Sequence, residues 1–377
     1  MLAVINATLV LEDHYIPGAA LLIDDGKIVD FGKNIKIPAE AELLDAKGLY
    51  AGPGLVDIHT HADGRQLFDK QPAQCCKTVL EHGVTSVLPA LYFDHTKEEY
   101  LASIDLIKNA VAAGSCPNLL GVYMEGPYLN PKYGADKNNT PWGGEIKEEE
   151  YGEIIERVGD FAKVWALSPE RDGIVEFAKN VKKNNPNAIF SVAHSEALPE
   201  QIEALIPYGL KLGTHHTNAT GTIVNYSECR GVCVDETVNF HDDIYAELIC
   251  DSMGIHVHPY MLRLVRKIKG RDKIILISDA FIGFGPPIPG CEEATDLCFD
   301  FDGEIAGSKM TLDVSCRNMM KHTGCSVCDA FHYASANPAR MLGIPDIGRI
   351  GIGAAANIIL VDEWFNVKKT ILKGEIM

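Results

Sequence analysis

The sequence predicts an α/β fold: a (β/α)8 TIM-like barrel with a small β-sandwich domain built from both chain ends. The middle of the chain alternates short apolar segments typical of strands with segments typical of helices, whereas both ends contain only strand-like segments. Eight strands with intervening helices over roughly 250 residues is the count of a closed α/β barrel. We therefore expect residues 1–52 and 346–377 to form the β-domain and residues 53–345 to form the barrel.

Apolar or β-branched runs, separated by turn signals such as Pro17-Gly18, make up both ends of the chain. Because the two ends resemble each other more than they resemble the middle, we expect their strands to pair. The expected strands are Ala3–Leu11, Ala19–Ile23, Lys27–Phe31, Leu43–Asp45, Asn357–Asp362 and Val367–Ile376.

The middle of the chain contains eight further strand-like runs, most of them followed by a helix-like segment. The expected strands are Leu55–Ile58, Val84–Leu88, Leu119–Met124, Val164–Leu167, Ala188–Ala193, Lys211–Thr214, Ala246–Cys250 and Ile274–Ser278. The expected helices include Pro72–His82, Lys97–Ala113, Ile174–Asn184 and Pro259–Lys269. A doubly wound open sheet is the competing interpretation. No Gly-x-Gly-x-x-Gly follows a strand, which disfavours its dinucleotide-binding version.

Composition and charge narrow the class of protein. The chain has 377 residues, 46% of them hydrophobic, and a formal net charge of −18. Such an acidic chain is a poor candidate for binding nucleic acid or an anionic membrane surface. The N-terminus lacks the basic and apolar regions of a signal peptide, and no apolar run approaches the ~20 residues of a membrane span. Eleven scattered cysteines suit a reducing compartment, so we expect a cytoplasmic enzyme.

Two histidines one residue apart follow the first expected barrel strand, Leu55–Ile58. His59 and His61 occupy positions i and i+2, which point to the same side of a strand. Imidazoles that converge in this way are good Zn²⁺ ligands. A partly buried histidine pair without a metal is the alternative for this motif taken alone.

Four more polar residues end strand-like runs: Glu125, His194, His215 and Asp279. In a TIM barrel the active site is built at the carboxyl ends of the strands, so all six side chains are expected at one face. A single polar residue at such a position is often structural, but six in the same structural position indicate a metal site.

The residue types indicate the chemistry of this site. Four histidines and one glutamate suit Zn²⁺, one or two ions per chain, with Fe²⁺, Mn²⁺ or Co²⁺ as alternatives. A bound metal lowers the pKa of its water and polarises a carbonyl group. Asp279 is then the best general base for that water and the donor of its proton to a leaving nitrogen. No Gly-x-Ser-x-Gly supplies a serine nucleophile.

Several motifs, taken together, resemble the amidohydrolase superfamily and, within it, the N-acetylglucosamine-6-phosphate deacetylases. The resemblance covers nearly the whole chain. The motif common to the superfamily is Gly54-Leu55-Val56-Asp57-Ile58-His59-Thr60-His61. The motifs specific to the deacetylases are Glu125-Gly126-Pro127-Tyr128-Leu129-Asn130-Pro131, Thr214-His215 with Asn218-Ala219, Asp251 through His256-Val257-His258, Ser278-Asp279-Ala280, Gly303-Glu304-Ile305-Ala306-Gly307-Ser308 and Asn337-Pro338-Ala339.

The resemblance implies roles for individual residues. Glu125, His194 and His215 match the ligands of the metal common to the family, and His59 and His61 match the ligands of a second metal found in some members. Asp279 matches the catalytic aspartate. The substrate-binding positions are His256, which polarises the acetyl carbonyl, and Asn218 and Ala219, which contact the substrate.

Departures from the family pattern concern the sugar phosphate. The arginine that binds the phosphate in the family has only Arg230 as its counterpart here, in a shifted register. The family's Gly-Ala-His is replaced by Gly134-Ala135-Asp136, and His216 and Thr217 replace an apolar pair. A different N-acetyl amino sugar or N-acyl compound without phosphate is therefore an alternative substrate to N-acetylglucosamine 6-phosphate.

Two other functions are weighed against deacetylation. Cyclic-amide hydrolases of the superfamily use a carboxylated lysine at the end of strand four, but Lys163 lies at the start of that expected strand. A non-enzymatic scaffold should have lost ligands, and all six positions are intact. We expect a small-molecule amino sugar as the substrate and a homodimer as the assembly.

Overall fold

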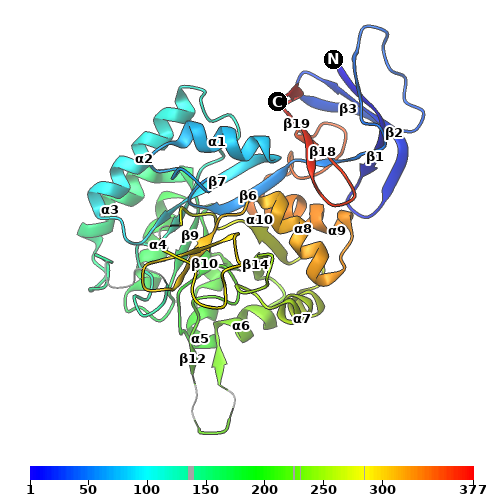
Figure 1. Cartoon of the computed structure of the whole chain (residues 1–377). Helices are drawn as coiled ribbons and strands as arrows, with labels where there is room; N and C mark the ends of the chain where they lie inside the picture. Colours follow the sequence, from blue (N-terminus) through cyan, green and yellow to red (C-terminus); the bar gives the residue numbers. More distant parts are fainter. Residues whose placement is uncertain (135–139, 224–225, 230, 284) are drawn as a thin grey trace.

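Eight parallel strands form the centre of the molecule and follow one another around it in chain order (Figure 1). The computed structural model describes residues 1–134, 140–223, 226–229, 231–283 and 285–377. The strands are β6 (Leu55–Thr60), β7 (Val84–Tyr92), β8 (Val122–Glu125), β9 (Ala162–Leu167), β10 (Ile189–Val192), β11 (Leu210–Gly213), β14 (Tyr245–Ile249) and β15 (Ile274–Ile277). The predicted α/β barrel is thereby confirmed.

Hydrogen bonds at the carboxyl ends of β15 and β6 bring the last strand beside the first. The backbone N–H of Asp279 donates to the carbonyl oxygen of His59 at 3.0 Å, and the N–H of His61 donates to that of Ala280 at 2.9 Å. Deeper in the barrel, the hydroxyl of Ser278 donates to the carboxylate of Asp57 at 2.6 Å. These contacts place the His-x-His motif and Asp279 side by side, although His61 and Asp279 are 218 positions apart in sequence.

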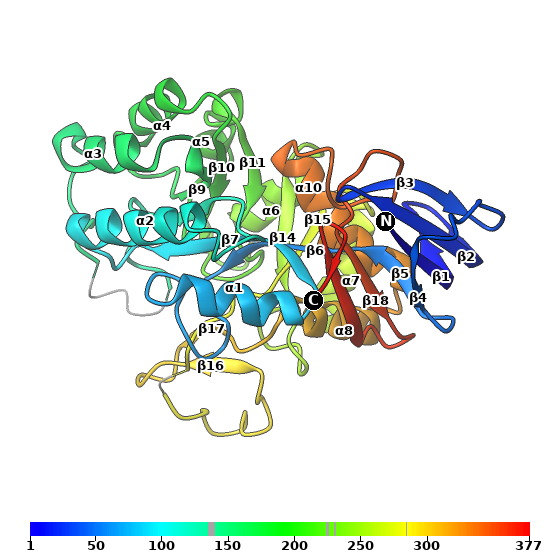
Figure 2. The same cartoon turned by 90° about the horizontal axis from the view of Figure 1, so that it is seen from above.

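Helices surround the barrel (Figures 1 and 2). Their starts carry recognisable signals: Thr96 and Glu99 form a reciprocal capping box at the second helix, and Pro72, Pro199 and Pro259 occupy first helical positions. The helices are α1 (Pro72–Glu81), α2 (Lys97–Ala112), α3 (Glu148–Val158), α4 (Ile174–Asn184), α5 (Pro199–Glu203), α6 (Val234–Phe240), α7 (Pro259–Lys269), α8 (Leu312–Thr323), α9 (Val327–Phe331) and α10 (Asn337–Leu342).

Both chain ends contribute to a second, mixed sheet beside the barrel, as predicted (Figure 2). The C-terminal strand β18 pairs antiparallel with the N-terminal strand β5, with Ile359 opposite Gly52. β1 carries β4 along its first half and β5 along its second half. The strands are β1 (Leu2–Val10), β2 (Tyr15–Asp24), β3 (Lys27–Gly32), β4 (Glu42–Asp45), β5 (Tyr50–Pro53), β18 (Ile358–Val361), β19 (Val367–Leu372) and β20 (Glu375–Ile376). The domain boundaries at residues 52 and 346 stay a prediction.

Some expected elements differ from the structure. The expected C-terminal strand Val367–Ile376 is a hairpin of β19 and β20, because Lys373 and Gly374 adopt positive φ angles of 49° and 85° and reverse the chain. The Pro17-Gly18 turn signal lies inside β2, which is longer than expected. The third barrel strand starts at Val122, and Leu119 makes only an isolated bridge to Val87.

Two small hairpins extend from the barrel. One consists of β12 (Thr222–Ile223) and β13 (Val232–Cys233), and the other of β16 (Leu297–Phe299) and β17 (Ile305–Ser308). Sequence patterns predicted neither of them. Among the helices of the described residues, none has the length and apolarity needed to cross a membrane.

Candidate metal centre and active site

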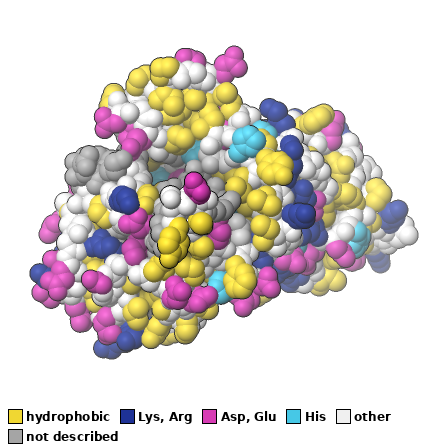
Figure 3. All heavy atoms as spheres, turned by 90° about the horizontal axis from the view of Figure 1, so that it is seen from below, with side chains coloured by type: hydrophobic (Ala, Val, Ile, Leu, Met, Phe, Trp, Pro, Cys, Tyr) yellow, Lys and Arg dark blue, Asp and Glu magenta, His cyan; other side chains and the backbone are white. Residues whose placement is uncertain are grey.

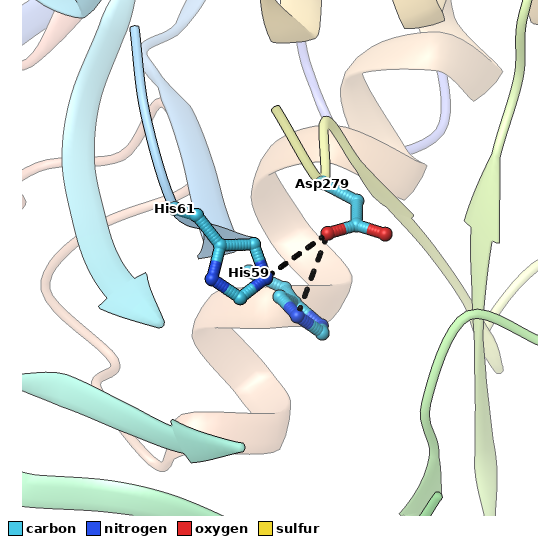
Figure 4. Close-up of side chains that lie close together, drawn as sticks. All are labelled: His59, His61 and Asp279. Carbon is cyan, nitrogen blue, oxygen red and sulfur yellow. Dashed lines mark ion pairs between the residues drawn. The ribbon is translucent and has the colours of Figure 1, made fainter. Parts of the chain in front are cut away.

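Six predicted side chains meet at the carboxyl ends of the barrel strands. His59 lies in β6 and His61 follows it, Glu125 ends β8, and the other three follow their strands: His194, His215 and Asp279. All six are at most 9% exposed. Figure 4 shows the rings of His59 and His61 turned toward the carboxylate of Asp279. The structure therefore brings together every predicted metal ligand and the predicted general base.

Glu125 lies between two groups of nitrogen ligands. Its Oε1 is 3.0 Å from His194 Nε2 and 3.3 Å from His215 Nε2. Its Oε2 is 3.0 Å from His61 Nε2 and 3.4 Å from His59 Nε2. Asp279 Oδ1 completes the second group at 3.4 Å from His61 Nε2 and 3.7 Å from His59 Nε2. One carboxylate thus faces both groups, with one oxygen for each.

The spacing of the donor atoms fits a small divalent cation. Ligand atoms about 2.0–2.1 Å from a tetrahedral Zn²⁺ are about 3.3 Å from one another. His194 Nε2 and His215 Nε2 are 3.1 Å apart, and each lies 3.0–3.3 Å from Glu125 Oε1. The ligand atoms within each group, His59 with His61 and Asp279, and Glu125 with His194 and His215, all lie within 4.8 Å of one another. Both groups therefore have the size and the donor types of a metal site.

The electrostatics of the cluster attract positive charge. Burial opposes ionisation of Glu125, but the charge of His59 and hydrogen bonds from His194 and His215 hold its pKa well below the usual value. The pKa of Asp279 is likewise lowered, because His59 and His61 outweigh the effect of burial. Burial also opposes protonation of His61, yet hydrogen bonds with Asp279 and Glu125 raise its pKa to about 9. A divalent cation that bound to these imidazole nitrogens would displace their protons.

Three of these residues adopt the left-handed backbone conformation that favours glycine. The φ angles are 43° at His194, 29° at His215 and 44° at Asp279. Residues in sparsely populated φ/ψ regions are typical of functional sites, because the surrounding structure must hold them there. All three side chains line the cavity at the carboxyl ends of the strands.

A cavity of about 560 Å³ opens above the metal groups. His256, Asn218 and Ala219 line it together with His61, Glu125 and other members of the cluster. The structure thus places these three predicted substrate-binding residues at the pocket. The fourth, Arg230, lies outside the described residues.

Among the residues that the structure describes, the charged side chains that line the cavity beside the metal ligands are mostly acidic. Asp94 and Glu304 line the cavity. Among the described lysines and arginines, Lys132 alone lines it. The ammonium group of Lys132 lies 2.6 Å from the carboxylate of Glu196. The described part of the cavity therefore carries little free positive charge for a phosphate.

Sequence reasoning missed three buried residues that support the ligands. Glu247 of β14 accepts a hydrogen bond from His59 Nδ1 at 3.2 Å. Tyr123 of β8 stacks on the His59 ring with centroids 4.4 Å apart. Asp57, whose pKa is raised to about 6 by burial, joins β6 to Ser278. The sequence signal that could have revealed Glu247 is a carboxylate inside an otherwise apolar strand.

The alternative with a carboxylated lysine does not fit the geometry. Lys163 lies at the amino end of β9, where its ammonium group donates to the carbonyl oxygen of Asp160 at 2.8 Å. At the carboxyl end of the same strand, the hydroxyl of Ser168 donates to backbone carbonyls of Ala193 and His194. Glu125, whose two oxygens face the two groups of histidines, is therefore the candidate acidic ligand of this site.

Comparison with known proteins agrees with this geometry. The model of the amidohydrolase family matches residues 50–377, which include all six converging side chains. The chain belongs to the amidohydrolase family. Metal dependence is characteristic of this family, and the two ligand groups supply the residues for it.

Relatives with similarity over nearly the full chain are sugar-phosphate deacetylases. N-acetylglucosamine-6-phosphate deacetylase of Bacillus subtilis (strain 168) is 28% identical, over 98% of this chain and 96% of the relative. N-acetylgalactosamine-6-phosphate deacetylase of Escherichia coli O157:H7 is also 28% identical, over 98% and 97%. The crystal structure of N-acetylglucosamine-6-phosphate deacetylase from Thermotoga maritima has a TM-score of 0.81 at 26% identity and covers 100% of this chain and 99% of that one. The enzyme of the same name from Pasteurella multocida shares the fold, with a TM-score of 0.87 at 24% identity, over 100% and 99% of the two chains.

Proposed function

We propose that this protein hydrolyses the acetamide of N-acetylglucosamine 6-phosphate to glucosamine 6-phosphate and acetate. The observation that carries the proposal is the meeting of Glu125, His194 and His215 with Asp279 at the mouth of the barrel, beneath a cavity lined by His256. The two deacetylase relatives that span nearly the whole chain support the same reaction class.

In the proposed reaction, Glu125, His194 and His215 hold one divalent cation, and His59 and His61 with Asp279 hold a second. When bound, such a cation supplies polarisation of the acetyl carbonyl and a water of lowered pKa. We assign Zn²⁺, because imidazole nitrogens dominate the ligand set.

Asp279 carries the protons in this proposal. Its low pKa keeps the carboxylate ionised at neutral pH, as a general base requires. It removes a proton from the attacking water as the new C–O bond forms at the acetyl carbon. It then delivers that proton to the sugar nitrogen as the C–N bond breaks, which yields acetate and the free amine.

His256 and Asn218 orient the substrate in this proposal. The Asp251 carboxylate accepts the backbone N–H of His256 at 2.8 Å and lies 3.6 Å from its ring Nδ1, which holds the imidazole at the pocket wall. The side-chain amide of Asn218 donates to the carbonyl oxygen of His215 at 3.2 Å. His256 then donates a hydrogen bond to the acetyl oxygen, and Asn218 and Ala219 contact the sugar. Arg230 binds the phosphate.

A second candidate is N-acetylgalactosamine 6-phosphate, because its deacetylase is as similar to this chain as the glucosamine enzyme is. Release of free amine from both 6-phosphates and from the unphosphorylated sugars separates the candidates. We expect the highest kcat/KM with N-acetylglucosamine 6-phosphate. A higher value with the galactosamine compound would reassign the substrate, and no amine release from any of them would refute deacetylation of amino sugars.

We further propose a homodimer, supported by exposed apolar side chains on the face shown in Figure 3. Phe240 of α6 is 78% exposed, and Leu264 and Ile268 of α7 are 37% and 46% exposed beside it along one groove. Apolar patches of this kind are typical of protein interfaces. Light scattering should give twice the mass of one chain, and the mass of a single chain would contradict the proposal.

A cytoplasmic location completes the proposal. All eleven cysteines are free thiols, which suits a reducing compartment. Cell fractionation should recover the protein with cytoplasmic markers.

A further inference from the structure

Glu247 is a buried carboxylate that neither the sequence motifs nor the ligand groups account for. It lies in the middle of β14, with none of its surface exposed to solvent. Its Oε2 accepts two hydrogen bonds, from His59 Nδ1 at 3.2 Å and from the backbone N–H of His215 at 3.2 Å. Its Oε1 has no hydrogen-bond partner among the described residues.

The contact with His59 fixes which ring nitrogen faces the metal groups. Oε2 of Glu247 already accepts the backbone N–H of His215, so it acts as an acceptor and Nδ1 of His59 is the donor, which leaves Nε2 of His59 to bind a metal. That Nε2 is the atom that lies 3.4 Å from Glu125 Oε2 and 3.7 Å from Asp279 Oδ1. Tyr123 stacks against the face of the same ring, so its rotation is restricted as well.

The contact with His215 joins Glu247 to the other ligand group. His215 has a φ of 29°, and its N–H points to the carboxylate of Glu247 instead of continuing a strand ladder. The next N–H, that of His216, donates to the backbone carbonyl of Glu247 at 2.8 Å. One residue of β14 therefore supports a ligand from each of the two metal groups.

Glu247 is placed behind the ligands and not among them. It contacts Nδ1 of His59, on the side of the ring away from Glu125 and Asp279. A carboxylate that is fully buried, with one oxygen unpaired, is costly unless positive charge lies nearby. Cations held through His59 and His215 would supply that charge.

We propose that Glu247 is a positioning residue that orients His59 for one metal and steadies His215 for the other. The inference rests on the metal centre of the proposed function. Outer partners of ligating histidines fix the tautomer and raise the basicity of the ligand, and their loss typically weakens metal affinity by about 10–100-fold.

The test is a titration of the metal-stripped, full-length chain with Zn²⁺ alone, without substrate. Glu247→Gln keeps the size of the side chain and removes its charge. We expect wild type to bind two Zn²⁺ per chain, and the Glu247→Gln variant to bind the weaker of them about 10–100-fold less tightly. The visible spectrum of the Co²⁺-loaded variant should change in parallel. Asp313→Asn is the matched control, because Asp313 of α8 is also buried and lies 3.5 Å from a histidine, His82, outside the site.

Equal affinities and Co²⁺ spectra in wild type and Glu247→Gln would overturn the proposal while leaving the proposed function intact. Equal loss of metal in Glu247→Gln and Asp313→Asn would show a general structural effect and would also overturn it. If wild type binds no Zn²⁺, both the positioning role and the proposed function fail. If Glu247→Gln does not fold, the same titration on Glu247→Asp tests the proposal in its place. The shorter side chain keeps the charge but withdraws it from His59. Failure of both variants to fold assigns Glu247 to the fold alone.

Discussion

Replacing Asp279 by asparagine removes the proposed proton carrier and weakens the second ligand group, His59 with His61 and Asp279. The substitution keeps the size of a side chain that is 8% exposed at the end of β15. Wild-type Asp279 is ionised at neutral pH because His59 and His61 lower its pKa against the effect of burial, whereas an amide can neither accept nor return the proton. General acid–base catalysis typically contributes about 10²–10⁴-fold, and here one residue serves both half-steps. We therefore expect kcat to fall by at least about 10²-fold, which corresponds to about 3 kcal/mol in the activation barrier.

The assay for Asp279→Asn is release of free amine from N-acetylglucosamine 6-phosphate at saturating concentration, with metal content measured on the same sample. Glu125, His194 and His215 form their own ligand group, so at least that metal should stay bound. KM should change far less than kcat. A variant that retains more than about a tenth of wild-type kcat would remove Asp279 from the mechanism. Loss of rate in step with loss of both metals would show that Asp279 acts only as a ligand.

The remaining predictions concern the second metal, the phosphate and stability. His59→Asn with His61→Asn should lower metal content from two ions to one per chain in elemental analysis, and loss of both ions would contradict the two-site arrangement. Arg230→Ala should raise KM strongly for the 6-phosphorylated substrate and little for its unphosphorylated analogue, whereas equal effects would show that Arg230 does not bind phosphate. Burial opposes protonation of His95, but hydrogen bonds with Asp69 and Asp94 raise its pKa to about 9. The interaction of protonated His95 with these carboxylates therefore stabilises the fold fully below pH 6.5, and this stabilisation is lost as the pH rises through 9. Asp69→Asn should therefore lower the free energy of unfolding, by at most about 3 kcal/mol, at pH 6 and much less at pH 10; equal losses at both pH values would refute the linkage.

The barrel was predictable because its strands are buried on both faces and read as apolar runs. In β6 all six residues are buried, and His59 and His61 mark the point where the strand reaches the barrel mouth. The positions of Glu125, His194, His215 and Asp279 were predictable in the same way, since each comes at or just after the end of an apolar run. The position of a polar residue at a strand end was therefore sufficient to predict that these ligands lie close together, although it does not predict the distances between them.

The division of the ligands into two groups was not predictable from the residues alone. It depends on the closure of β15 against β6, which places Asp279 beside His61 and leaves Glu125 between the groups. The two small hairpins were missed for a different reason. Their strands have two to four residues, too few for an alternating pattern to be distinguished from a loop.

Glu247 shows what local pattern reasoning omits. A polar residue in the middle of an apolar strand reads as an interruption, and its partners come from β6 and from the segment after β11. Only the folded barrel reveals that His59 and His215 both donate hydrogen bonds to its carboxylate.

Metal content and activity measured together test the central claim most directly. Wild-type protein is stripped with a chelator, then reloaded with Zn²⁺ in steps while amine release from N-acetylglucosamine 6-phosphate is followed at each step. We predict that the stripped protein is inactive, that activity returns with the first or second equivalent, and that binding saturates at two ions per chain. Full activity in the stripped protein, or no activity and no bound metal after reloading, would contradict a metal-dependent deacetylase.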